Sequence, residues 1–346
     1  MEKYTSQVKT PKVSIAPMVD KTHRHFRYFS RLLTKEALLY TEMVTAQSII
    51  HGNRDKILYF REAEGPVALQ IAASNPEDAY KAVKYAEEYN YTEINLNCGC
   101  PSDRVSGNLM GAALMSSKDL VYEILCAMKE ATNKPITIKH RIGIDGTGVL
   151  EDTKNKIIMS GYDDLLEFLN TISRAKPDRY TIHARSAILK GLSPKDNREI
   201  PPLDYDMVYR LKKEFDYLNI EINGGFKTIA SIKDALTKVD GVMIGRSAYE
   251  DCYLLSNFYK LYDDFEDRKP ISRGDAIKAY IPYIIEELEK GNSVHALVSP
   301  LHSLFQGEKG NKKYKQLLSS SNVKKETIID VLNNILETMP QDALWN

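Results

Sequence analysis

Eight short runs of β-branched and apolar residues recur along the chain, and they constrain its fold more than any other feature. The runs cover residues 13–16, 38–41, 67–69, 94–96, 136–138, 180–182, 220–222 and 242–244. A polar residue, a proline or a glycine follows each run, and segments with helical periodicity, such as residues 76–89, lie between them. The spacing of about 33 residues matches one βα unit. Eight such units in sequence predict an α/β fold, a closed (β/α)₈ barrel rather than an open doubly wound sheet.

The pattern changes near residue 265, because only helical spacing follows. Tyr280, Ile284 and Leu288 repeat at this spacing, as do apolar residues within 328–339. We therefore predict a catalytic barrel over residues 1–265 and a small helical domain over residues 266–346. Residues 146–161 show little periodicity and are predicted to form a loop insertion after the fifth strand.

Composition narrows the class of protein. The chain has 346 residues, 47 Lys and Arg against 47 Asp and Glu, and 43% hydrophobic residues. No run approaches the roughly 20 apolar residues of a membrane span, and the first ten residues lack the apolar stretch of a secretory signal. We expect a cytoplasmic monomer with no membrane partner. Zero net charge at first argues against a nucleic-acid partner, because Lys and Arg supply most of the affinity for phosphates.

Four cysteines are present, Cys98, Cys100, Cys126 and Cys252. They are too few and too irregularly spaced for a disulfide framework, and no pair has the C-x-x-C spacing of a zinc site. We expect reduced thiols and no bound metal.

Two glycine motifs follow the last two predicted strands. Asn223, Gly224 and Gly225 follow the seventh strand, and Gly245 and Arg246 follow the eighth. Glycines let backbone N–H groups approach an anion closely, and an arginine adds a two-pronged donor. Each motif alone is equally well an ordinary turn. Their presence on adjacent strands of a barrel favours a phosphate site.

Gln70, Lys139 and His183 stand at the ends of three other predicted strands. A lysine at the barrel mouth can neutralise an anionic ring or form a Schiff base. For any one of these residues, a site role and simple capping of the barrel remain equally open. Together with the phosphate motifs, they fit a phosphorylated flavin better than a small sugar phosphate.

Cys100 lies on the loop after the fourth predicted strand. An unperturbed thiol has a pKa near 8.5, so it is mostly protonated at neutral pH and can donate a proton. Cys98 is closer to the strand and is predicted to pack as a small hydrophobic residue. For Cys100 the residues alone leave a proton donor and an inert thiol equally open.

Several long strings resemble the tRNA-dihydrouridine synthases, and in particular their bacterial A-type branch. The strings are Ala16-Pro17-Met18 and residues 39–44, 93–97, 99–105, 139–145, 182–185, 191–195 and 197–205. The resemblance covers nearly the whole chain. It implies an FMN-containing barrel with a helical C-terminal domain. Such enzymes reduce the C5–C6 double bond of D-loop uridines in tRNA with NADPH, in this branch at position 20/20a.

The resemblance also assigns roles to individual residues. It implies that Cys100 protonates C5 of uracil after a hydride reaches C6, and that Asn97 and Arg185 contact the uridine. The residues implied to hold the flavin ring and ribityl chain are Pro17, Met18, Gln70, Lys139 and His183. Those implied to hold the FMN phosphate are Asn223, Gly224, Gly225, Gly245 and Arg246. No G-x-G-x-x-G string follows a strand, so NADPH is expected to dock transiently at the flavin.

The predicted helical domain carries a stretch of lysines without a carboxylate among them. They are Lys309, Lys312, Lys313, Lys315, Lys324 and Lys325. With the resemblance, RNA contact is favoured over a solvated face for this stretch, which removes the objection from net charge. Tyr314 either stacks on a base or packs inside. Arg24, Arg27 and Arg31 share one face of a predicted helix, a pattern typical of a solvated face.

The chain departs from the branch at Ser299-Pro300, where relatives have an Arg-His pair, and this leaves the target uridine open. Two other functions compete. One is a different FMN barrel, such as a dihydroorotate or ene-type reductase that acts on a free small molecule. The other is a flavin-bearing protein that binds tRNA without reducing it. The lysine stretch argues against the first, and the presence of Cys100 and Lys139 argues against the second.

Overall fold

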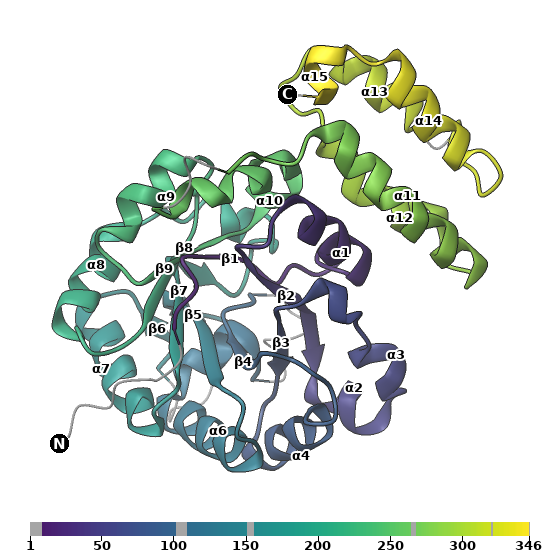
Figure 1. The fold of residues 1–346 in the computed structure, drawn as a ribbon. Coiled ribbons are helices and arrows are strands. Elements are labelled where there is room, and N and C mark those ends of the chain that lie inside the picture. Colours follow the sequence, from purple (N-terminus) through teal and green to yellow (C-terminus); the bar gives the residue numbers. More distant parts are fainter. Residues whose placement is uncertain (1–8, 102–108, 151–155, 264–267, 320, 346) are drawn as a thin grey trace.

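The computed structural model describes residues 9–101, 109–150, 156–263, 268–319 and 321–345. Its centre is a ring of parallel strands in the order β4-β3-β2-β1-β9-β8-β7-β5, closed by pairing of β4 with β5 (Figure 1). The bounds are β1 (Val13–Ile15), β2 (Leu38–Thr45), β3 (Val67–Ala72), β4 (Glu93–Cys98), β5 (Ile136–Asp145), β7 (Arg179–Ile188), β8 (Ile220–Asn223) and β9 (Gly241–Ile244). Each of the eight predicted strands is present, and the predicted barrel is confirmed.

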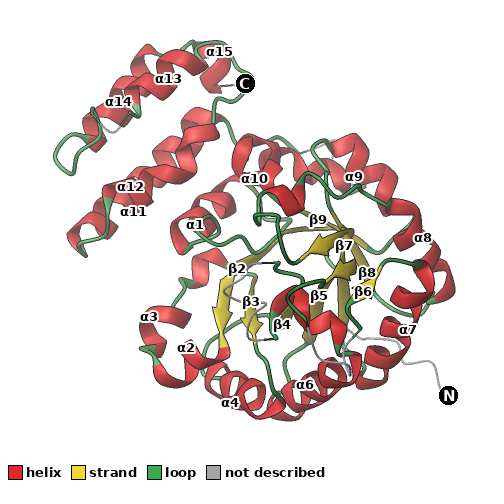
Figure 2. Ribbon diagram, turned by 180° about the vertical axis from the view of Figure 1, so that it is seen from behind, coloured by secondary structure: helices red, strands yellow, loops and turns green. Residues whose placement is uncertain are grey.

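Helices form a layer around the strands (Figures 1 and 2). They are α1 (Arg24–Leu33), α2 (Ala46–His51), α3 (Arg54–Leu58), α4 (Pro76–Ala86), α6 (Lys118–Ala131), α7 (Tyr162–Ile172), α8 (Tyr205–Glu214), α9 (Ile229–Leu236) and α10 (Arg246–Glu250). Short 3₁₀ segments include η1 (Glu62–Glu64), η2 (Gly111–Ser116) and η5 (Cys252–Leu261). Helix α4 shows how sequence starts these helices. The Asn75 side chain accepts a hydrogen bond from the Asp78 N–H, and Pro76 occupies the first turn.

The predicted loop insertion after the fifth strand is partly wrong. Residues Ile158 and Met159 form β6, which pairs antiparallel with Asp145 and Ile144 at the end of β5. Strand β5 extends beyond its last pair with β4, so its free edge needs a partner for its backbone groups. Strand β6 supplies that partner. Residues 151–155 lie outside the described part of the chain.

A group of helices follows the barrel and lies beside α1 (Figures 1 and 2). It comprises α11 (Arg273–Glu289), α12 (Val294–Val298), η7 (Ser299–Ser303), α13 (Asn311–Leu317), α14 (Ile328–Thr338) and α15 (Gln341–Trp345). The predicted boundary near residue 265 falls between η5 and α11 and stays a prediction. Among the residues that the structure describes, no helix is both long and apolar enough to cross a membrane.

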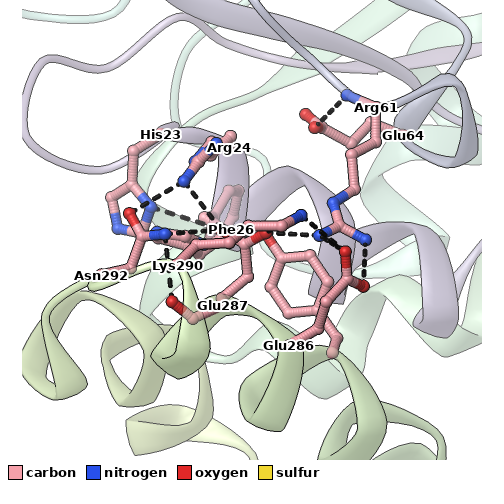
Figure 3. A network of polar contacts seen from close by, with 11 residues as sticks. His23, Arg24, Phe26, Arg61, Glu64, Glu286, Glu287, Lys290 and Asn292 are labelled. Atoms are coloured by element: carbon pink, nitrogen blue, oxygen red, sulfur yellow. Dashed lines mark hydrogen bonds and ion pairs between the residues drawn. The ribbon is translucent and has the colours of Figure 1, made fainter.

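Charged side chains join α1 and the start of η1 to α11 (Figure 3), and two aromatic rings stack at the same contact. Arg24 Nη2 lies 2.7 Å from a carboxylate oxygen of Glu287. The Arg61 guanidinium contacts Glu287 as well and donates two 2.8 Å hydrogen bonds to Glu286. The rings of Tyr28 and Tyr283 stack with centroids 3.8 Å apart. We call these residues, Tyr28, Arg24, Arg61, Tyr283, Glu286 and Glu287, the domain contact.

The predicted solvated face of α1 is therefore wrong. Arg27 is buried and pairs with the buried Glu64 at 2.8 Å. Arg31 donates to the backbone carbonyls of Ala37 and Glu64. Arg24 reaches α11. The charge pattern on α1 is typical of a solvated helix, but its carboxylate and carbonyl partners come from distant segments that periodicity does not show.

The inside of the barrel has an apolar side and a polar side. Ala16, Leu38, Tyr40, Ala68 and Met243 form one buried cluster. Strands β4, β5, β7 and β8 instead contribute buried polar side chains: Glu93, Asn95, Thr137, Arg179, Thr181 and Glu221. Branched aliphatic residues usually fill such barrels. The polar half must therefore be held by hydrogen bonds and ion pairs.

Candidate active site at the barrel mouth

Parallel strands bring the residues at their carboxyl ends to one rim of the barrel. Asn97 is the register partner of Lys139 across β4 and β5. His183 is the partner of Asn223 across β7 and β8, and of Arg141 across β5 and β7. Polar residues that are far apart in sequence thus become neighbours. The structure brings the predicted strand-end residues together at one mouth.

Asn97 shapes the turn that carries Cys100. Its Oδ1 accepts hydrogen bonds from the backbone N–H groups of Gly99 and Cys100, each at 3.1 Å. Its Nδ2 donates to Gln70 Oε1 at 2.7 Å. Cys100 is partly exposed at the rim, whereas Cys98 is fully buried and burial raises the pKa of its thiol. The prediction that Cys98 packs as a hydrophobic residue is confirmed. Residues 102–105 of the same motif lie outside the described residues.

The ammonium group of Lys139 forms no hydrogen bond or ion pair with any residue that the structure describes, although the backbone of Lys139 belongs to the β5 ladder. Burial lowers the pKa of its ammonium to about 8, and the charge of Arg141 acts in the same direction. An anionic group beside Lys139 would raise this pKa and hold the lysine in its charged form. Lys139 is therefore suited to face an anion.

His183 is buried and lies against Gly224. Burial, followed by the charges of Arg141 and Lys139, lowers the pKa of its imidazole well below the ordinary value, so it is neutral. A Cβ atom added at Gly224 would lie 3.0 Å from His183 Cδ2 and 2.7 Å from Leu203. Gly224 and Gly225 also have φ values of 127° and 75°, which favour glycine. The close backbone approach at this end of β8 depends on both glycines.

The ends of β8 and β9 form the candidate phosphate site. Asn223 Nδ2 donates to the Met243 carbonyl at 2.8 Å and ties the two strands together. An added Cβ at Gly245 would meet only the Ala16 Cβ, at 3.8 Å, so space lies open before the Gly245 backbone. Arg246 lies at this end and pairs with Glu199 at 2.6 Å. Open space, glycine backbone and an arginine fit a phosphate group.

Pro17 and Met18 follow β1 at the same rim. The Met18 N–H donates to Thr22 Oγ1 at 3.0 Å, and its carbonyl accepts from the Thr22 and Lys21 N–H groups. The Met18 side chain packs on the apolar cluster inside the barrel. This turn gives the mouth an apolar side opposite Lys139 and His183.

Sequence reasoning missed two arginines of the mouth, Arg141 and Arg198. Arg141 donates to the carbonyls of Gly99, Ser186 and Asn197 at 2.9, 3.0 and 3.1 Å. Burial lowers its pKa to about 10, and the charges of Arg198 and Arg185 add to this. Arg141 stands two residues after Lys139 on β5, so strand alternation could have placed it in the mouth.

Arg185 reaches the carbonyls of Glu199 and Pro201 in the loop after β7. Among the described residues, neither Lys139, Arg141, Arg185 nor Arg198 forms an ion pair, whereas Arg246 pairs with Glu199. The mouth therefore carries an excess of positive charge.

The lysines of the helical group are exposed, and their predicted contact with RNA stays a prediction. Lys313 Nζ donates to the Thr338 carbonyl at 2.9 Å, and Lys315 Nζ donates to Gln306 Oε1 at 3.1 Å, while Lys312 is exposed on the same helix. Tyr314 is fully buried and donates its hydroxyl hydrogen to the Leu301 carbonyl at 2.9 Å. Of the two alternatives for Tyr314, packing is the one that the structure has.

Ser299 lies where the helical group meets the barrel. Ser299 Oγ is 3.1 Å from His23 Nε2, and His23 precedes α1. Burial lowers the pKa of His23 to about 4, with the charge of Arg27 next in importance, so the imidazole is neutral at physiological pH. Ser299 therefore lies at the contact between the two parts of the chain.

Comparison with known proteins agrees with this geometry. The family model for dihydrouridine synthase (Dus) matches residues 14–343. The chain is 44% identical to the tRNA-dihydrouridine(20/20a) synthase of Vibrio parahaemolyticus over 96% of this chain and 98% of the relative. It is 44% identical to the enzyme of the same name from Synechocystis over 89% of each chain, and 41% identical to that of Pseudomonas putida over 94% of this chain and 93% of the relative.

A solved structure of a 2-naphthoyl-CoA reductase shares the fold, with a TM-score of 0.50 and 12% identity over 72% of this chain and 50% of that one. At such low sequence identity, the similarity supports only the fold and not a shared activity. The family is shown by the model match over nearly the whole chain and by relatives that align with this chain over most of their own length. The chain belongs to the dihydrouridine synthase family, flavin-dependent oxidoreductases that reduce uridine to dihydrouridine.

Proposed function

We propose that this protein reduces the C5–C6 double bond of a D-loop uridine in tRNA, at position 20/20a, to give 5,6-dihydrouridine. The observation that carries the proposal is the placement of Cys100. Asn97 fixes its turn at the rim of a mouth that Gln70, Lys139 and His183 line. The full-length relatives named tRNA-dihydrouridine(20/20a) synthase support the substrate and the position.

FMN is the proposed flavin, and it supplies the hydride for C6 of uracil when bound. The glycine turns and Arg246 would hold its phosphate, as described for the ends of β8 and β9. The residues that would hold its ring and ribityl chain are Pro17, Met18, Gln70, Lys139 and His183. Their fit rests on the Lys139 ammonium, which has no partner among the described residues, and on the open space before the Gly245 backbone. NADPH is the proposed reductant, and the mouth is its docking place.

Cys100 donates the second hydrogen of the reaction as a proton. Its thiol hydrogen goes to C5 of uracil, and the S–H electron pair stays on sulfur as a thiolate. Lys139, Arg141 and Arg198 lie within electrostatic range of Cys100. Their positive charges stabilise that thiolate until a proton returns from solvent. Proton donation from a positioned group typically contributes about 10²–10⁴-fold to the rate.

The substrate base must leave the tRNA stack to reach this mouth, and the open barrel end provides the pocket for it. Asn97 and Arg185 would contact the extruded uridine. Lys312, Lys313 and Lys315 would contact the tRNA backbone from the exposed face of α13. The proposal includes a monomer acting in the cytoplasm, where tRNA and NADPH meet.

The test is a map of dihydrouridine in tRNA from cells with and without the gene. We expect loss at position 20/20a alone, and restoration by the wild-type gene but not by the Cys100→Ala variant. Unchanged dihydrouridine at every D-loop position would refute the proposal. Reduction of free uracil or orotate by the purified protein, without reduction of tRNA, would favour the small-molecule reductase instead.

A further inference from the structure

The polar half of the barrel interior contains a continuous chain of hydrogen bonds. Its lower end is Glu93, whose carboxylate forms a buried ion pair with Arg179 at 2.5 Å. Glu93 Oε1 also accepts from the Tyr40 hydroxyl at 2.9 Å and from Thr137 Oγ1 at 3.0 Å. Asn95 Nδ2 lies 2.8 Å from Thr137 Oγ1 and continues the chain upward.

The upper half leads to the turn that carries Cys100. Gln70 Nε2 and Asn95 Oδ1 are 2.8 Å apart, and Asn97 Nδ2 and Gln70 Oε1 are 2.7 Å apart. Asn97 Oδ1 then faces the N–H groups of Gly99 and Cys100. We call the side chains Glu93, Thr137, Asn95, Gln70 and Asn97 the polar chain. Apart from the last contacts to the turn, its hydrogen bonds are all buried.

Both ends of the polar chain demand the same direction of donation. The Glu93 carboxylate is paired with a guanidinium and can only accept hydrogen bonds. Thr137 must therefore donate its one hydroxyl hydrogen to Glu93. Thr137 Oγ1 then has to accept from Asn95, which requires the NH₂ group of Asn95 and leaves its oxygen for Gln70. Gln70 must therefore donate from Nε2 to Asn95, which leaves its oxygen to accept from Nδ2 of Asn97. At the top, backbone N–H groups can only donate, and they meet the oxygen of Asn97.

Because the two fixed ends agree, all three amides are held in one of their two orientations. An amide can otherwise exchange its oxygen and nitrogen by a half turn at little cost in shape. Both lone pairs of Asn97 Oδ1 are occupied by N–H groups, and one hydrogen of Nδ2 is used by Gln70. Only one N–H of Asn97 remains for a ligand.

We propose that the polar chain sets the chemistry of the mouth from the barrel floor, with Thr137 and Asn95 as positioning residues. It presents Asn97 to the uridine as a hydrogen-bond donor, which matches a carbonyl oxygen of uracil. It also fixes the turn of Cys100. This inference rests on the proposed function, because it takes Asn97 and Cys100 as the residues that meet the base.

Replacement of Thr137 by valine tests the inference, since it removes the hydroxyl with little change in shape. Thr181 is the matched control, because it is equally buried in the barrel but donates to Glu221 at 2.6 Å, outside the polar chain. In the holoenzyme we expect Thr137→Val to lower kcat for tRNA reduction about 10-fold while KM for tRNA changes less than about 2-fold. Thr137→Ser should restore kcat, and Thr181→Val should resemble the wild type.

A second readout does not depend on activity. In holoenzyme labelled with ¹⁵N in Asn and Gln side chains, Thr137→Val should shift or broaden the amide signals of Gln70, Asn95 and Asn97. The signal of Asn223, which donates to the Met243 carbonyl, is an internal control and should stay in place. If Thr137→Val does not fold, Thr137→Ala breaks the same link and must give both changes.

The inference is overturned if Thr137→Val keeps wild-type kcat and amide signals, or if Thr181→Val lowers kcat equally. Its failure is distinguishable from failure of the proposed function. A wild-type protein that cannot form dihydrouridine in tRNA refutes the proposed function, and the amide signals still test the orientation. An active wild type with an unaffected Thr137→Val variant refutes the polar chain alone.

Discussion

The barrel mouth and the domain contact both gather basic side chains, but they differ in what those side chains meet. At the domain contact, Arg24 and Arg61 bind the carboxylates of Glu286 and Glu287. At the mouth, Arg141 and Arg185 bind only backbone carbonyls, within the described part of the chain. Carbonyl groups orient a guanidinium without neutralising it.

The pKa shifts follow this difference. The hydrogen bonds that Arg61 donates to Glu286 raise the pKa of Arg61 above its ordinary value. Burial and neighbouring positive charges lower the pKa of Arg141, Arg185 and Arg198. Carboxylates match the arginine charges at the domain contact, whereas the charges of Arg141, Arg185 and Arg198 have no carboxylate partner among the described residues. These three arginines thus keep charges that no described carboxylate neutralises, whereas Arg24 and Arg61 serve a structural contact.

The largest expected effect belongs to the mouth. Cys100→Ala removes the proposed proton donor and should lower the rate of tRNA reduction by about 10³-fold. Reduction of the flavin by NADPH should be unchanged, because it does not use the thiol. Stopped-flow measurement of the two half-reactions separates these rates. Cys126→Ala, on the outer helix α6, is the matched control. Full activity of Cys100→Ala would contradict the assignment.

The next effect belongs to the domain contact. Glu287→Ala leaves Arg24 and Arg61 without their shared, nearly buried carboxylate and should lower the free energy of unfolding by about 3 kcal/mol. Urea unfolding measures this loss. The affinity for FMN should not change, because Glu287 pairs with Arg24 and Arg61 and with none of the residues proposed to hold the flavin. If Glu287→Ala lowered the affinity for FMN but not the free energy of unfolding, Glu287 would belong to the flavin site and not to a structural contact.

A smaller effect separates the phosphate from the ring of the flavin. Arg246→Met should weaken binding of FMN about 30-fold, since a charged hydrogen bond contributes about 2 kcal/mol. Riboflavin, which lacks the phosphate, should bind equally well to the variant and the wild type. Fluorescence titration of the flavin-free protein gives both affinities, and Arg61→Met serves as a control arginine. An equal loss for both flavins would place Arg246 elsewhere than at the phosphate.

The smallest effect depends on pH. Hydrogen bonds from Arg61 and then Lys290 lower the pKa of the exposed Glu286 to about 2, from an ordinary value of 4.5. A carboxyl group with a depressed folded pKa stabilises the fold above its unfolded pKa, and this contribution fades as the pH falls from about 4.5 to about 2. The Tm of Glu286→Gln should therefore lie slightly below that of the wild type at pH 7. The two values should converge near pH 2, and a constant difference across this range would rule out the pairing.

The sequence predicted the barrel and the meeting of Gln70, Lys139 and His183, because strand repeats and strand ends are local signals. It did not predict that the side chains of Arg27 and Tyr314 are buried. The partner of Arg27, Glu64, lies 37 residues later in the chain, beyond β2, α2 and α3. Tyr314 is buried against Phe305 and the Leu301 carbonyl. Both residues look like surface residues by their neighbours in sequence. Burial of this kind depends on packing between distant segments, which no periodicity encodes.

Arg141 shows where the boundary of prediction lies. Its alternation with Lys139 on β5 was visible in the sequence. Its three carbonyl partners, however, come from the loop after β4, from β7 and from the loop after β7. Likewise, Asn97 was assigned to the uridine by resemblance alone. The hydrogen bonds that its Oδ1 accepts from the turn of Cys100 are visible only in the structure.

The polar barrel interior also bears on how the strands find their alignment. Glu93, Asn95 and Asn97 alternate along β4, so a slip of one residue would turn all three toward the outer helices. Each buried polar group that lost its partner would cost about 1–3 kcal/mol. An aliphatic interior would tolerate such a slip far better, because one methyl group substitutes for another. The residues that orient the amides of the mouth thus also fix the register of the strands. A barrel that closes in the correct register therefore also places the polar groups of its mouth.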